Sequence, residues 1–492
     1  MAKGKHPTLR SRFVSLLSKV VVRFAHLSSN GHNSEMKLLR FCIPVVFSVL
    51  SVAPLAQALS KQPASVYHAR RVALAAKLHG GIAVLFADEE PLLDLTPYRQ
   101  DEDFYYLTGW NEPGAALLIV AASDSGPSPA GQPDPQDNRP YTEILFLPTR
   151  NLRMEKYTGV KLDAVTPGAA QTAGVDAVRA MTDMPGVLNG IIAADRRMAS
   201  RLWAQPDHTQ SKALTDFAAA TLGINSLPQP HDVAELTKEL RVVKDDGELE
   251  LLKKASDASM AAQRAMMRAV KPGAAERGVA GIMYAAWMEH GCERASYAPI
   301  AGSGHASTVL HYSSNDGTMK EGDVVVVDAA CEFSMYASDI TRTVPVSGHF
   351  TPRQREIYDV VLGAQRAAAE AFVAGKSKIN DRDRRDANSL DTVAYNYINT
   401  HGKSLDGKPL GQYWLHGLGH MVGIDVHDPA TYPAVLTPGM VFTIEPGVYI
   451  PEENLGVRIE DVFVVGADGK LIDLVADLPH SAEEVEAAMR GK

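Results

Sequence analysis

The sequence predicts an α+β protein in which a smaller, mixed α/β domain precedes a larger C-terminal domain. The chain has 492 residues, which is more than one hydrophobic core usually serves and favours two domains. Short apolar runs between residues 81 and 147 predict strands of one sheet. In the C-terminal half, long helical patterns mix with strand patterns of the antiparallel type, as in α+β folds.

The N-terminal segment is typical of a secretory signal peptide. A short positive stretch runs from Met36 to residue 40, residues 41–55 are mostly apolar, and residues 56–58 have the small side chains of a cleavage site. The apolar stretch is too short for a comfortable membrane span. Residues 1–35 fit a start codon assigned too early, a long basic leader or an organelle presequence. We therefore exclude residues 1–60 from the fold and expect export to the periplasm or the medium, or a cytoplasmic protein if the segment is not used.

Residues 61–231 form the predicted N-terminal domain. Three apolar runs in it are typical of strands: residues 81–86, 115–120 and 142–147. Residues 123–140 are rich in Ser, Gly, Pro and Asp and predict a long loop inserted between two strands. The stretch 227–232 breaks the pattern with two prolines, so we place the start of the second domain, residues 232–492, there.

Two long helices are predicted in the second domain. The first covers residues 246–270, with apolar side chains at helical spacing and Asp245 or its neighbour as the cap. The second begins at Thr351, which forms a capping box with Gln354, and it runs to Gly375. Four strands are predicted: residues 323–328, 340–344, 440–445 and 457–465.

Charge and cysteine content exclude several classes of function. The formal net charge is −9, the isoelectric point is about 6.0, and no purely basic run follows the first 40 residues, so we expect no nucleic-acid partner. Cys42, Cys292 and Cys331 lack the paired spacing of a zinc knuckle. Cleavage after residue 58 leaves Cys292 and Cys331, which an oxidising compartment would allow to pair.

Several acidic residues of the second domain lie at the ends of apolar strands. Asp328 follows four valines, Glu445 follows Val-Phe-Thr-Ile, and Glu460 lies within another apolar run. A carboxylate at such a position is partly buried and needs a partner, because its desolvation is costly. The partner is either an arginine, for which Arg342 and Arg458 are available, or a metal ion.

A glycine-rich loop with three histidines, His416, His420 and His427, occurs in the same half. Its glycines argue against a helical zinc pair. Together with the acids, which include Asp339, the loop favours a metal centre with a histidine wall. Two divalent cations balance four carboxylates, and oxygen-rich ligation with one imidazole favours Mn²⁺, Co²⁺ or Zn²⁺. Two such ions about 3.5–4 Å apart activate a shared water for hydrolysis.

The motifs around these residues resemble those of a known family. They are Val327-Asp-Ala-Ala330, Ser338-Asp-Ile-Thr-Arg-Thr343, His416-Gly-Leu-Gly-His420, Thr443-Ile-Glu-Pro-Gly447 and Val457-Arg-Ile-Glu-Asp461. Together they resemble the proline-specific aminopeptidases of the pita-bread metallopeptidase family, and aminopeptidase P above all. Residues 98–113 look like part of the N-terminal domain of aminopeptidase P, and residues 308–312 are similar to a substrate-binding segment. The resemblance implies a pita-bread catalytic domain.

The resemblance also implies a metal ligand for each of five positions. Asp328 would bind one metal ion, Asp339 and Glu460 would bridge two ions, and His420 and Glu445 would complete the second site. Glu445 would also move the proton of the attacking water, which makes it a catalytic residue as well as a ligand.

Further residues acquire roles through the same resemblance. His311, His416 and His427 would line the substrate site, and His416, His427 and Arg458 would take part in catalysis. Arg458 would hold a carboxylate of the metal site in place. Thr341 and Thr443 are either donors to metal-binding carboxylates or ordinary strand threonines.

The implied function is release of the N-terminal residue from peptides whose second residue is proline, by attack of a metal-bridging hydroxide. Two divalent ions are implied, with Mn²⁺ as the first choice and Co²⁺ or Zn²⁺ as alternatives. Family members often form dimers or tetramers, so we expect a homo-oligomer. The alternative is prolidase, an Xaa-Pro dipeptidase. A creatinase-like enzyme without metal and a binding protein on an inactive scaffold are disfavoured by the intact ligand set.

Overall fold

The computed structural model describes residues 59–90, 98–121, 141–223, 225, 227 and 229–491. The predicted signal peptide and the predicted loop of residues 123–140 lie outside these residues. Contacts between Cα atoms separate residues 59–492, called the second unit below, from residues 1–58.

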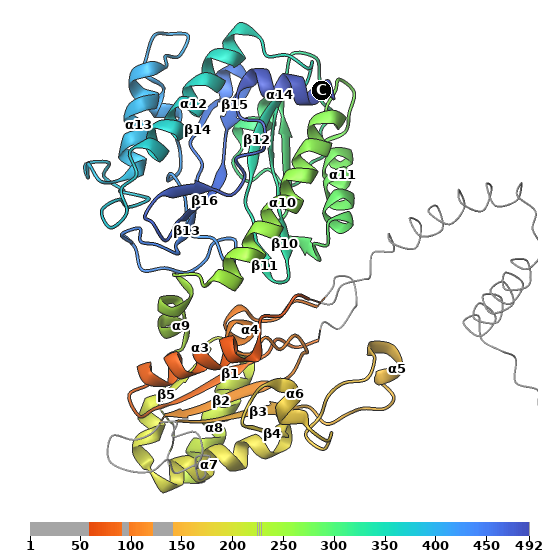
Figure 1. Cartoon of the computed structure of the whole chain (residues 1–492), viewed down its shortest axis with the longest axis vertical. Helices are drawn as coiled ribbons and strands as arrows, with labels where there is room; N and C mark the ends of the chain where they lie inside the picture. Colours follow the sequence, from red (N-terminus) through yellow and green to blue (C-terminus); the bar gives the residue numbers. More distant parts are fainter. Residues whose placement is uncertain are drawn as a thin grey trace, which may run out of the picture. The chain divides into compact units, whose positions relative to one another are not determined.

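The N-terminal region of this unit is built on one mixed sheet. Its helices are α3 (Ala64–Lys77), α4 (Glu102–Thr108), α5 (Glu155–Thr158), α6 (Ala169–Ala173), α7 (Met184–Ala194) and α8 (Thr209–Leu222), with 3₁₀ helices η1 (Met181–Asp183) and η2 (Arg196–Arg201). Its strands are β1 (Ile82–Phe86), β2 (Ala116–Ala121), β3 (Tyr141–Leu147), β4 (Ala177–Ala180), β5 (Leu202–Ala204) and β6 (His231–Asp232). The strand order is β4-β3-β2-β1-β5-β6, antiparallel from β1 to β3 and parallel elsewhere (Figure 1).

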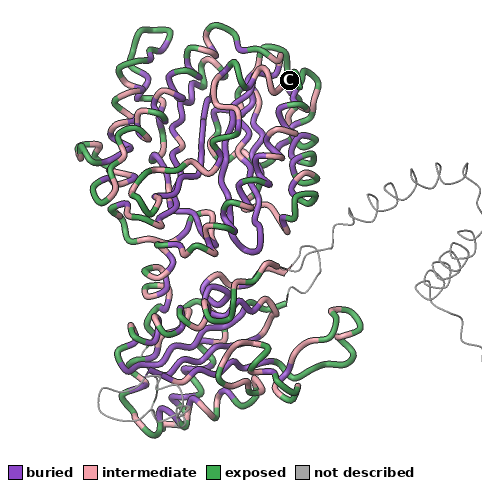
Figure 2. Tube along the Cα trace, in the orientation of Figure 1, coloured by how far each residue is buried: buried purple, intermediate pink, exposed green. Residues whose placement is uncertain are grey.

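The central strands are apolar throughout because both faces of the sheet are covered. In β1, Ile82 and Val84 pack with Leu188 of α7 in one cluster, whereas Ala83 and Leu85 belong to the core that also contains residues of α3 and α4. Figure 2 shows these strands as a buried layer. The three strands predicted between residues 81 and 147 are thereby confirmed.

The C-terminal region has more helices and several small sheets. Its helices are α9 (Ala234–Arg241), α10 (Asp246–Ala269), α11 (Glu276–Glu289), α12 (Pro352–Glu370), α13 (Leu390–His401) and α14 (Ala482–Met489), with 3₁₀ helices η3 (Gly304–Thr308), η4 (Leu410–Tyr413) and η5 (Pro451–Glu453). Its strands are β7 (Arg294–Ala295), β8 (Ile300–Ser303), β9 (Val324–Asp328), β10 (Cys331–Phe333), β11 (Tyr336–Ala337), β12 (Thr341–Pro345), β13 (Val441–Ile444), β14 (Gly447–Ile450), β15 (Leu455–Arg458), β16 (Asp461–Val465) and β17 (Leu471–Asp473).

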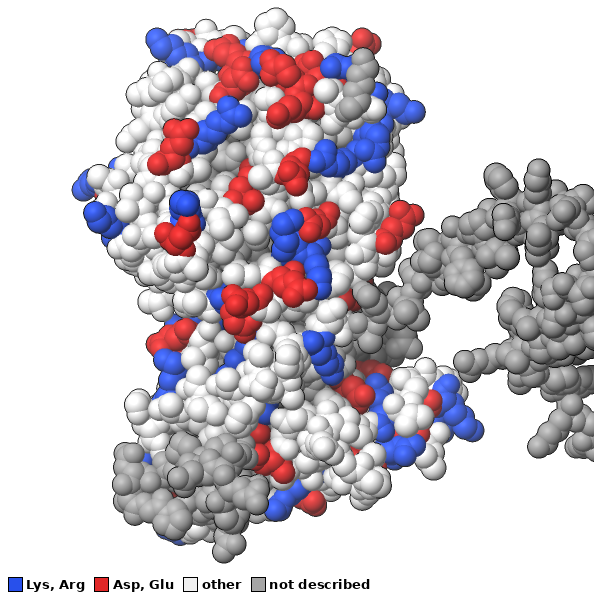
Figure 3. Space-filling model, viewed as in Figure 1, with Lys and Arg blue, Asp and Glu red and all other residues white. Residues whose placement is uncertain are grey.

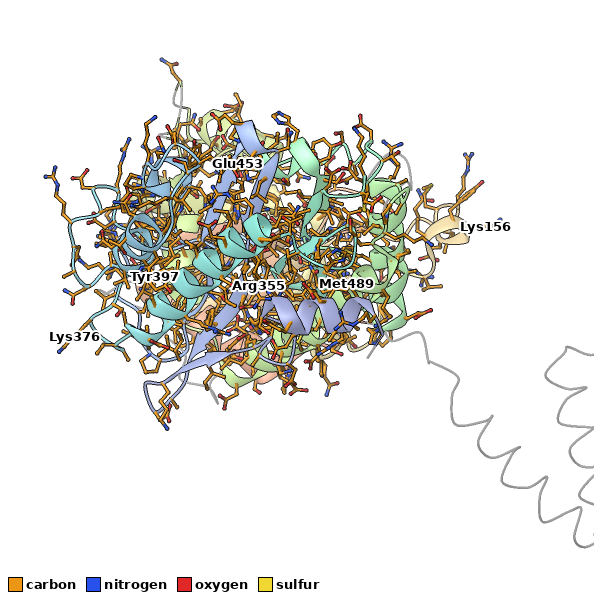
Figure 4. All side chains as sticks on the ribbon, turned by 90° about the horizontal axis from the view of Figure 1, so that it is seen from above. Lys156, Arg355, Lys376, Tyr397, Glu453 and Met489 are labelled. Atoms are coloured by element: carbon orange, nitrogen blue, oxygen red, sulfur yellow. A yellow bond between two sulfur atoms is a disulfide. The ribbon has the colours of Figure 1, made fainter. Side chains whose placement is uncertain are left out.

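Helix starts in this region follow the sequence closely. Asp245 and Glu248 form a capping box at α10, and Thr351 and Gln354 form another at α12. Helix α10 packs against α11, and α12 packs against α13 (Figure 1). Seen from above in Figure 4, the labelled Arg355 lies on α12 beside α14, and its guanidinium donates to Glu483.

Three antiparallel sheets meet where the predicted acids lie. Their strand orders are β12-β9-β8, β13-β16-β17 and β14-β15. An isolated bridge pairs Thr341 with Glu460 and connects the first sheet to the other two. The ends of several strands are therefore brought to one place although they lie far apart in the sequence.

Two predicted elements differ from the structure. The strand predicted over residues 457–465 is broken, because β15 pairs with β14 whereas β16 pairs with β13. Glu460 lies at the break, where its N–H donates to the carbonyl of Thr341 at 3.1 Å. Helix α12 ends at Glu370 and not at Gly375, because the chain turns there and the N–H of Gly375 bonds to Leu436.

The two cysteines of the second unit are paired. Cys292, which follows α11, forms a disulfide with Cys331 in β10, and both side chains are buried. This pairing was left open by the sequence. It links the segment that precedes Tyr297 to the segment that follows Asp328.

The surface of the described residues is of mixed charge. On the face in Figure 3, acidic and basic side chains are interspersed, without an extended basic area among the residues described there. Within the same part of the chain, none of the helices combines the length and the apolar character that a bilayer crossing needs.

Candidate metal centre and active site

The five predicted ligands converge on one cavity of about 500 Å³. Asp328 ends β9, Asp339 lies two residues before β12, Glu445 follows β13, and Glu460 lies between β15 and β16. His420 comes from an irregular loop, as its glycines predict. All five residues line the cavity.

The loop of His420 is held against β13 by backbone contacts. The N–H of His420 donates to Thr443 Oγ1 at 3.1 Å, and the N–H of Thr443 donates back to the His420 carbonyl at 2.9 Å. Gly419 is required for this approach, because a Cβ at that position would lie 2.1 Å from the Thr443 carbonyl oxygen. The local sequence therefore fixes where the imidazole points.

The imidazole of His420 is oriented as a metal ligand would be. Its Nδ1 lies 3.1 Å from the Met421 carbonyl, so Nδ1–H is the donor and Nε2 is the nitrogen that a neutral ring would offer to a metal ion. Nε2 lies 3.3 Å from Asp339 Oδ2 and 3.4 Å from Glu445 Oε1. Donor atoms of Asp339, His420 and Glu460 all lie within 4.8 Å of one another.

Asp328, Glu445 and Glu460 have raised pKa values, chiefly because they are buried. Burial raises the pKa of Glu445 to about 7, and burial together with neighbouring acids raises that of Glu460 well above its usual range. Burial also raises the pKa of Asp328, although Arg458 opposes this. Burial lowers the pKa of His420, but Asp339 and Glu445 outweigh it and raise the value to about 9. Four clustered carboxylates and one imidazole are a donor set that fits divalent metal ions.

Hydrogen bonds from two threonines orient two of these carboxylates. Thr341 Oγ1 donates to Glu460 Oε2 at 2.6 Å, and Thr443 Oγ1 donates to Glu445 Oε1 at 3.3 Å. Both threonines therefore act as donors to candidate ligands and are not ordinary strand residues. Arg342 does not pair with these acids.

Tyr297 is part of the site and was not found from the sequence. Its hydroxyl lies 2.6 Å from Asp328 Oδ1 and 2.5 Å from Asp339 Oδ1. It therefore sets the spacing of two candidate ligands. No local pattern around Tyr297 distinguishes it from a core tyrosine, so the sequence offered no signal for it.

Arg458 begins a chain of hydrogen bonds behind the ligands. It donates to Asp328 Oδ2 at 2.6 Å, to Thr341 Oγ1 at 3.2 Å and to the hydroxyl of Tyr449 at 2.9 Å. The Tyr449 hydroxyl in turn lies 2.8 Å from His416 Nε2. Arg458 is thus the arginine partner of Asp328, and Tyr449 is a second site residue that the sequence did not reveal.

The three predicted substrate-site histidines all line the cavity. Both ring nitrogens of His416 are engaged, Nδ1 with the Gly417 carbonyl at 2.7 Å and Nε2 with Tyr449. Burial lowers the pKa of His416 to about 4, so its ring is neutral. His427 stacks edge-on against His420 with ring centroids 4.2 Å apart.

Segment 98–113 of the N-terminal region contacts the catalytic region close to the loop that carries His420 and His427. Arg99 donates to Glu332 at 2.9 Å and to the carbonyl of Ile424 at 3.0 Å. Asp103 of α4 accepts from Arg241 of α9 at 2.8 Å. The motif that resembles aminopeptidase P therefore anchors the two regions to each other.

Comparisons with known proteins identify both regions. Residues 250–467 match the model of metallopeptidase family M24, and residues 67–199 match the aminopeptidase P N-terminal domain. The chain is 31% identical to the Xaa-Pro aminopeptidase of Haemophilus influenzae over 88% of its length and 98% of that protein. It is 32% identical to human Xaa-Pro aminopeptidase 3, over 79% of this chain and 76% of that one.

Solved structures give the same result for the fold. Zn-substituted Escherichia coli aminopeptidase P in complex with product superposes with a TM-score of 0.74 at 28% identity, covering 88% of this chain and 99% of that chain. A variant of the same enzyme in complex with substrate gives a TM-score of 0.73 at 27% identity over the same shares. These matches confirm the predicted pita-bread catalytic domain with a smaller N-terminal domain, and the chain belongs to the aminopeptidase P group of metallopeptidase family M24.

Proposed function

We propose that the protein releases the N-terminal residue from peptides with proline in the second position. The observation that carries this proposal is the complete set of Asp328, Asp339, His420, Glu445 and Glu460 in one cavity of a chain that matches Xaa-Pro aminopeptidases across both regions. As a member of family M24, the protein is a metallo-exopeptidase that uses divalent metal ions.

These five residues are proposed to hold two divalent ions, with Mn²⁺ as the native metal and Co²⁺ or Zn²⁺ as alternatives. Carboxylate-rich ligation with one imidazole supports these metals over thiolate-bound ones. When bound, the ions supply Lewis acidity that ionises water near neutral pH and stabilises an oxyanion.

Glu445 is proposed to move the proton. Its Oε1 is oriented by Thr443, and its Oε2 lies 3.9 Å from His416 Nδ1. A carboxylate in this position accepts a proton from the attacking water and delivers it to the proline nitrogen as the peptide bond breaks. The proline nitrogen needs this proton because it leaves as a secondary amine.

Arg458, Tyr449 and His416 are proposed to keep the site in its working geometry. Arg458 fixes Asp328, and Tyr449 connects Arg458 to His416. Because both nitrogens of His416 are engaged, a direct contact with substrate would require one of those bonds to exchange. Among the described contacts, no hydrogen bond holds the ring nitrogens of His311 or His427. These two histidines are therefore proposed to contact the substrate.

The apolar part of the cavity suits a proline ring. Ile300, Leu310 and Val426 line it beside His311 and His427. A proline at this position brings no N–H into the site, so an apolar wall leaves no donor unsatisfied. Any other residue at this position would bring an amide N–H for which the apolar wall has no acceptor.

Export and self-association are proposed as well. The buried Cys292–Cys331 disulfide supports passage through an oxidising compartment, in line with the signal-like residues 36–58.

Exposed apolar side chains such as Leu152 and Tyr157 support a contact between copies of the chain, as a dimer or tetramer. Light scattering after size-exclusion chromatography measures the assembly directly.

The activity is tested with three substrates on Mn²⁺-loaded protein: an Xaa-Pro-Xaa tripeptide, an Xaa-Pro dipeptide and an Xaa-Ala-Xaa tripeptide as the control. Release of the first residue from the proline tripeptide, with little cleavage of the control, is the expected result. Cleavage of the dipeptide alone would make the protein a prolidase. A metal-loaded protein that cleaves neither proline peptide would contradict the proposal.

A further inference from the structure

A second cavity, of about 760 Å³, adjoins the one that holds the candidate ligands. The two cavities share His420, His427, Gly419 and Asn380 in their walls. The other side of the second cavity is bounded by a strongly charged loop, residues 380–388, with the sequence Asn-Asp-Arg-Asp-Arg-Arg-Asp-Ala-Asn. This loop has no part in the chemistry described above.

Hydrogen bonds hold the charged loop in place. The carboxylate of Asp381 accepts backbone N–H groups of Arg385 at 2.6 Å and Asp386 at 2.7 Å. Asn380 donates from Nδ2 to the Gly419 carbonyl at 2.6 Å, next to His420. The loop is therefore attached to the wall that it shares with the metal-ligand cavity.

Arg384 serves as an anchor inside this loop. It donates to Asp391 Oδ2 at 3.1 Å and to the His416 carbonyl at 3.3 Å. Its guanidinium also lies 4.2 Å from the ring centroid of Tyr395. These contacts use the charge of Arg384 within the protein, so it is not available to a ligand.

The charged side chains of the second cavity differ in how they are held. Asp381 is satisfied by backbone donors, and Asp428 is buried and paired with Arg241 at 2.7 Å and Lys244 at 2.9 Å. Arg382 lines the same cavity, is exposed, and forms no ion pair with any residue in the part of the chain that the structure describes. The cavity therefore presents a guanidinium that has no ion-pair partner among the described residues, beside the backbone-bonded carboxylate of Asp381.

We propose that the second cavity receives the peptide residues that follow the proline and that Arg382 binds a carboxylate there. This inference rests on the proposed function. An enzyme that removes one residue holds only that residue on one side of the broken bond, so the rest of the peptide needs a path on the other side. A guanidinium on that path favours an anionic group, which is either the C-terminal carboxylate of a tripeptide or an acidic side chain.

The test compares peptides that differ only in this charge, using Mn²⁺-loaded protein. Initial rates are measured for an Xaa-Pro-Ala tripeptide as the free acid and as the C-terminal amide, and for amidated Xaa-Pro-Asp and Xaa-Pro-Asn. The variants are Arg382→Ala, Arg382→Lys and the control Arg385→Ala, which removes a neighbouring exposed arginine that does not line the cavity.

The wild type is expected to prefer the free acid by about three- to tenfold in kcat/KM, the range for a partly exposed charge-assisted bond. Arg382→Ala is expected to bring the acid-to-amide ratio close to one, mainly through KM. Arg382→Lys should keep part of the preference for the free acid, and Arg385→Ala should keep all of it. A preference for amidated Xaa-Pro-Asp over amidated Xaa-Pro-Asn that depends on Arg382 identifies the acidic side chain as the ligand. If only the acid-to-amide ratio of Xaa-Pro-Ala depends on Arg382, the C-terminal carboxylate is the ligand.

Two results would overturn the inference while the proposed function stands. One is that both ratios, free acid to amide for Xaa-Pro-Ala and Asp to Asn for the amidated peptides, are the same in the wild type and in Arg382→Ala. The other is an altered preference for the first residue of the substrate in Arg382→Ala, since that would place the amino-terminal side of the peptide in the second cavity. If no Xaa-Pro peptide is cleaved at all, the proposed function itself fails and the inference falls with it.

Discussion

Glu445 lies between groups that define its chemistry. Thr443 holds one of its oxygens, His420 Nε2 lies 3.4 Å from the same oxygen, and His416 lies near the other. Replacement by glutamine keeps the shape of the side chain but removes its capacity to accept a proton. This makes the position suitable for separating proton transfer from packing.

Glu445→Gln is therefore expected to lower kcat on an Xaa-Pro-Xaa tripeptide by about 10²–10⁴-fold, the usual contribution of a general base. Steady-state kinetics with metal content measured in parallel check this. The exposed Glu452→Gln serves as the control and is expected to behave like the wild type. A Glu445→Gln enzyme that keeps its metal and its full kcat would show that another group moves the proton.

At the residue scale, the sequence predicted the side chains that carry a recognisable pattern. Asp328, Glu445 and Glu460 stand out because an acid inside or after an apolar strand is costly to bury. Tyr297 and Tyr449 do not stand out, because a tyrosine beside apolar residues is ordinary in a core. Their roles come from hydrogen bonds across long sequence separations, which no local pattern encodes.

At the scale of elements, a buried polar cluster joins β12, β16 and α12. Asp461 accepts from Arg342 at 2.7 Å, from Gln365 at 2.8 Å and from His480 at 2.9 Å. Donor atoms of Asp461, Asp473 and His480 lie within 4.8 Å of one another, but the guanidinium of Arg342 already contacts Asp461 and His480. We therefore interpret this cluster as structural.

Asp461→Asn is expected to destabilise the protein by about 3–5 kcal/mol near neutral pH, because it leaves the buried Arg342 without its counter-charge. Burial raises the pKa of Asp461, but Arg342 and His480 outweigh it and lower the pKa to about 2. A lowered folded-state pKa means that the carboxylate stabilises the fold above its unfolded pKa of about 4, and that this contribution is lost as the pH falls towards 2.

Urea unfolding of the wild type and of Asp461→Asn at about pH 7 and about pH 3 measures this dependence. The difference in the free energy of unfolding should be larger at the higher pH. Asp468→Asn, on an exposed turn, is the control and should change stability little at either pH. An equal difference at both pH values would contradict the assignment of charge to Asp461.

Element types were predictable where the pattern was long. The helices that begin at Asp246 and Pro352 carry both periodicity and capping boxes, so their starts were predicted closely. The break at Glu460 was not predictable, because two apolar strands in different sheets follow one another without a turn signal. The early end of α12 depends on a bond to Leu436, which is a tertiary contact.

At the scale of the whole molecule, the two regions are connected by buried ion pairs. Arg241 contacts Asp103 of the N-terminal region and Asp428 of the catalytic region, next to His427. The sequence predicted two domains from length, and the boundary at residues 231 and 232 stays a prediction. Which residues connect the regions could not be predicted, because the partners lie more than a hundred residues apart.

The Cys292–Cys331 disulfide is expected to be intact in protein recovered from an oxidising compartment. Thiol labelling of the denatured protein should then find both cysteines blocked until a reductant is added. Replacement of both by serine should lower the free energy of unfolding by about 2–5 kcal/mol, because the cross-link constrains the unfolded chain. Two freely labelled thiols in the exported protein would contradict the pairing.

The most direct test of the proposed metal centre is the number of metal ions that each chain binds. Protein stripped of metal is titrated with Mn²⁺, and bound metal is counted for the wild type, Asp339→Ala, Glu460→Ala and the exposed control Glu452→Ala. A dinuclear centre at these residues predicts two ions per chain in the wild type and the control, and fewer than two in both variants, with peptide hydrolysis lost alongside. A wild type that binds fewer than two ions, or variants that still bind two, would contradict the proposed dinuclear centre.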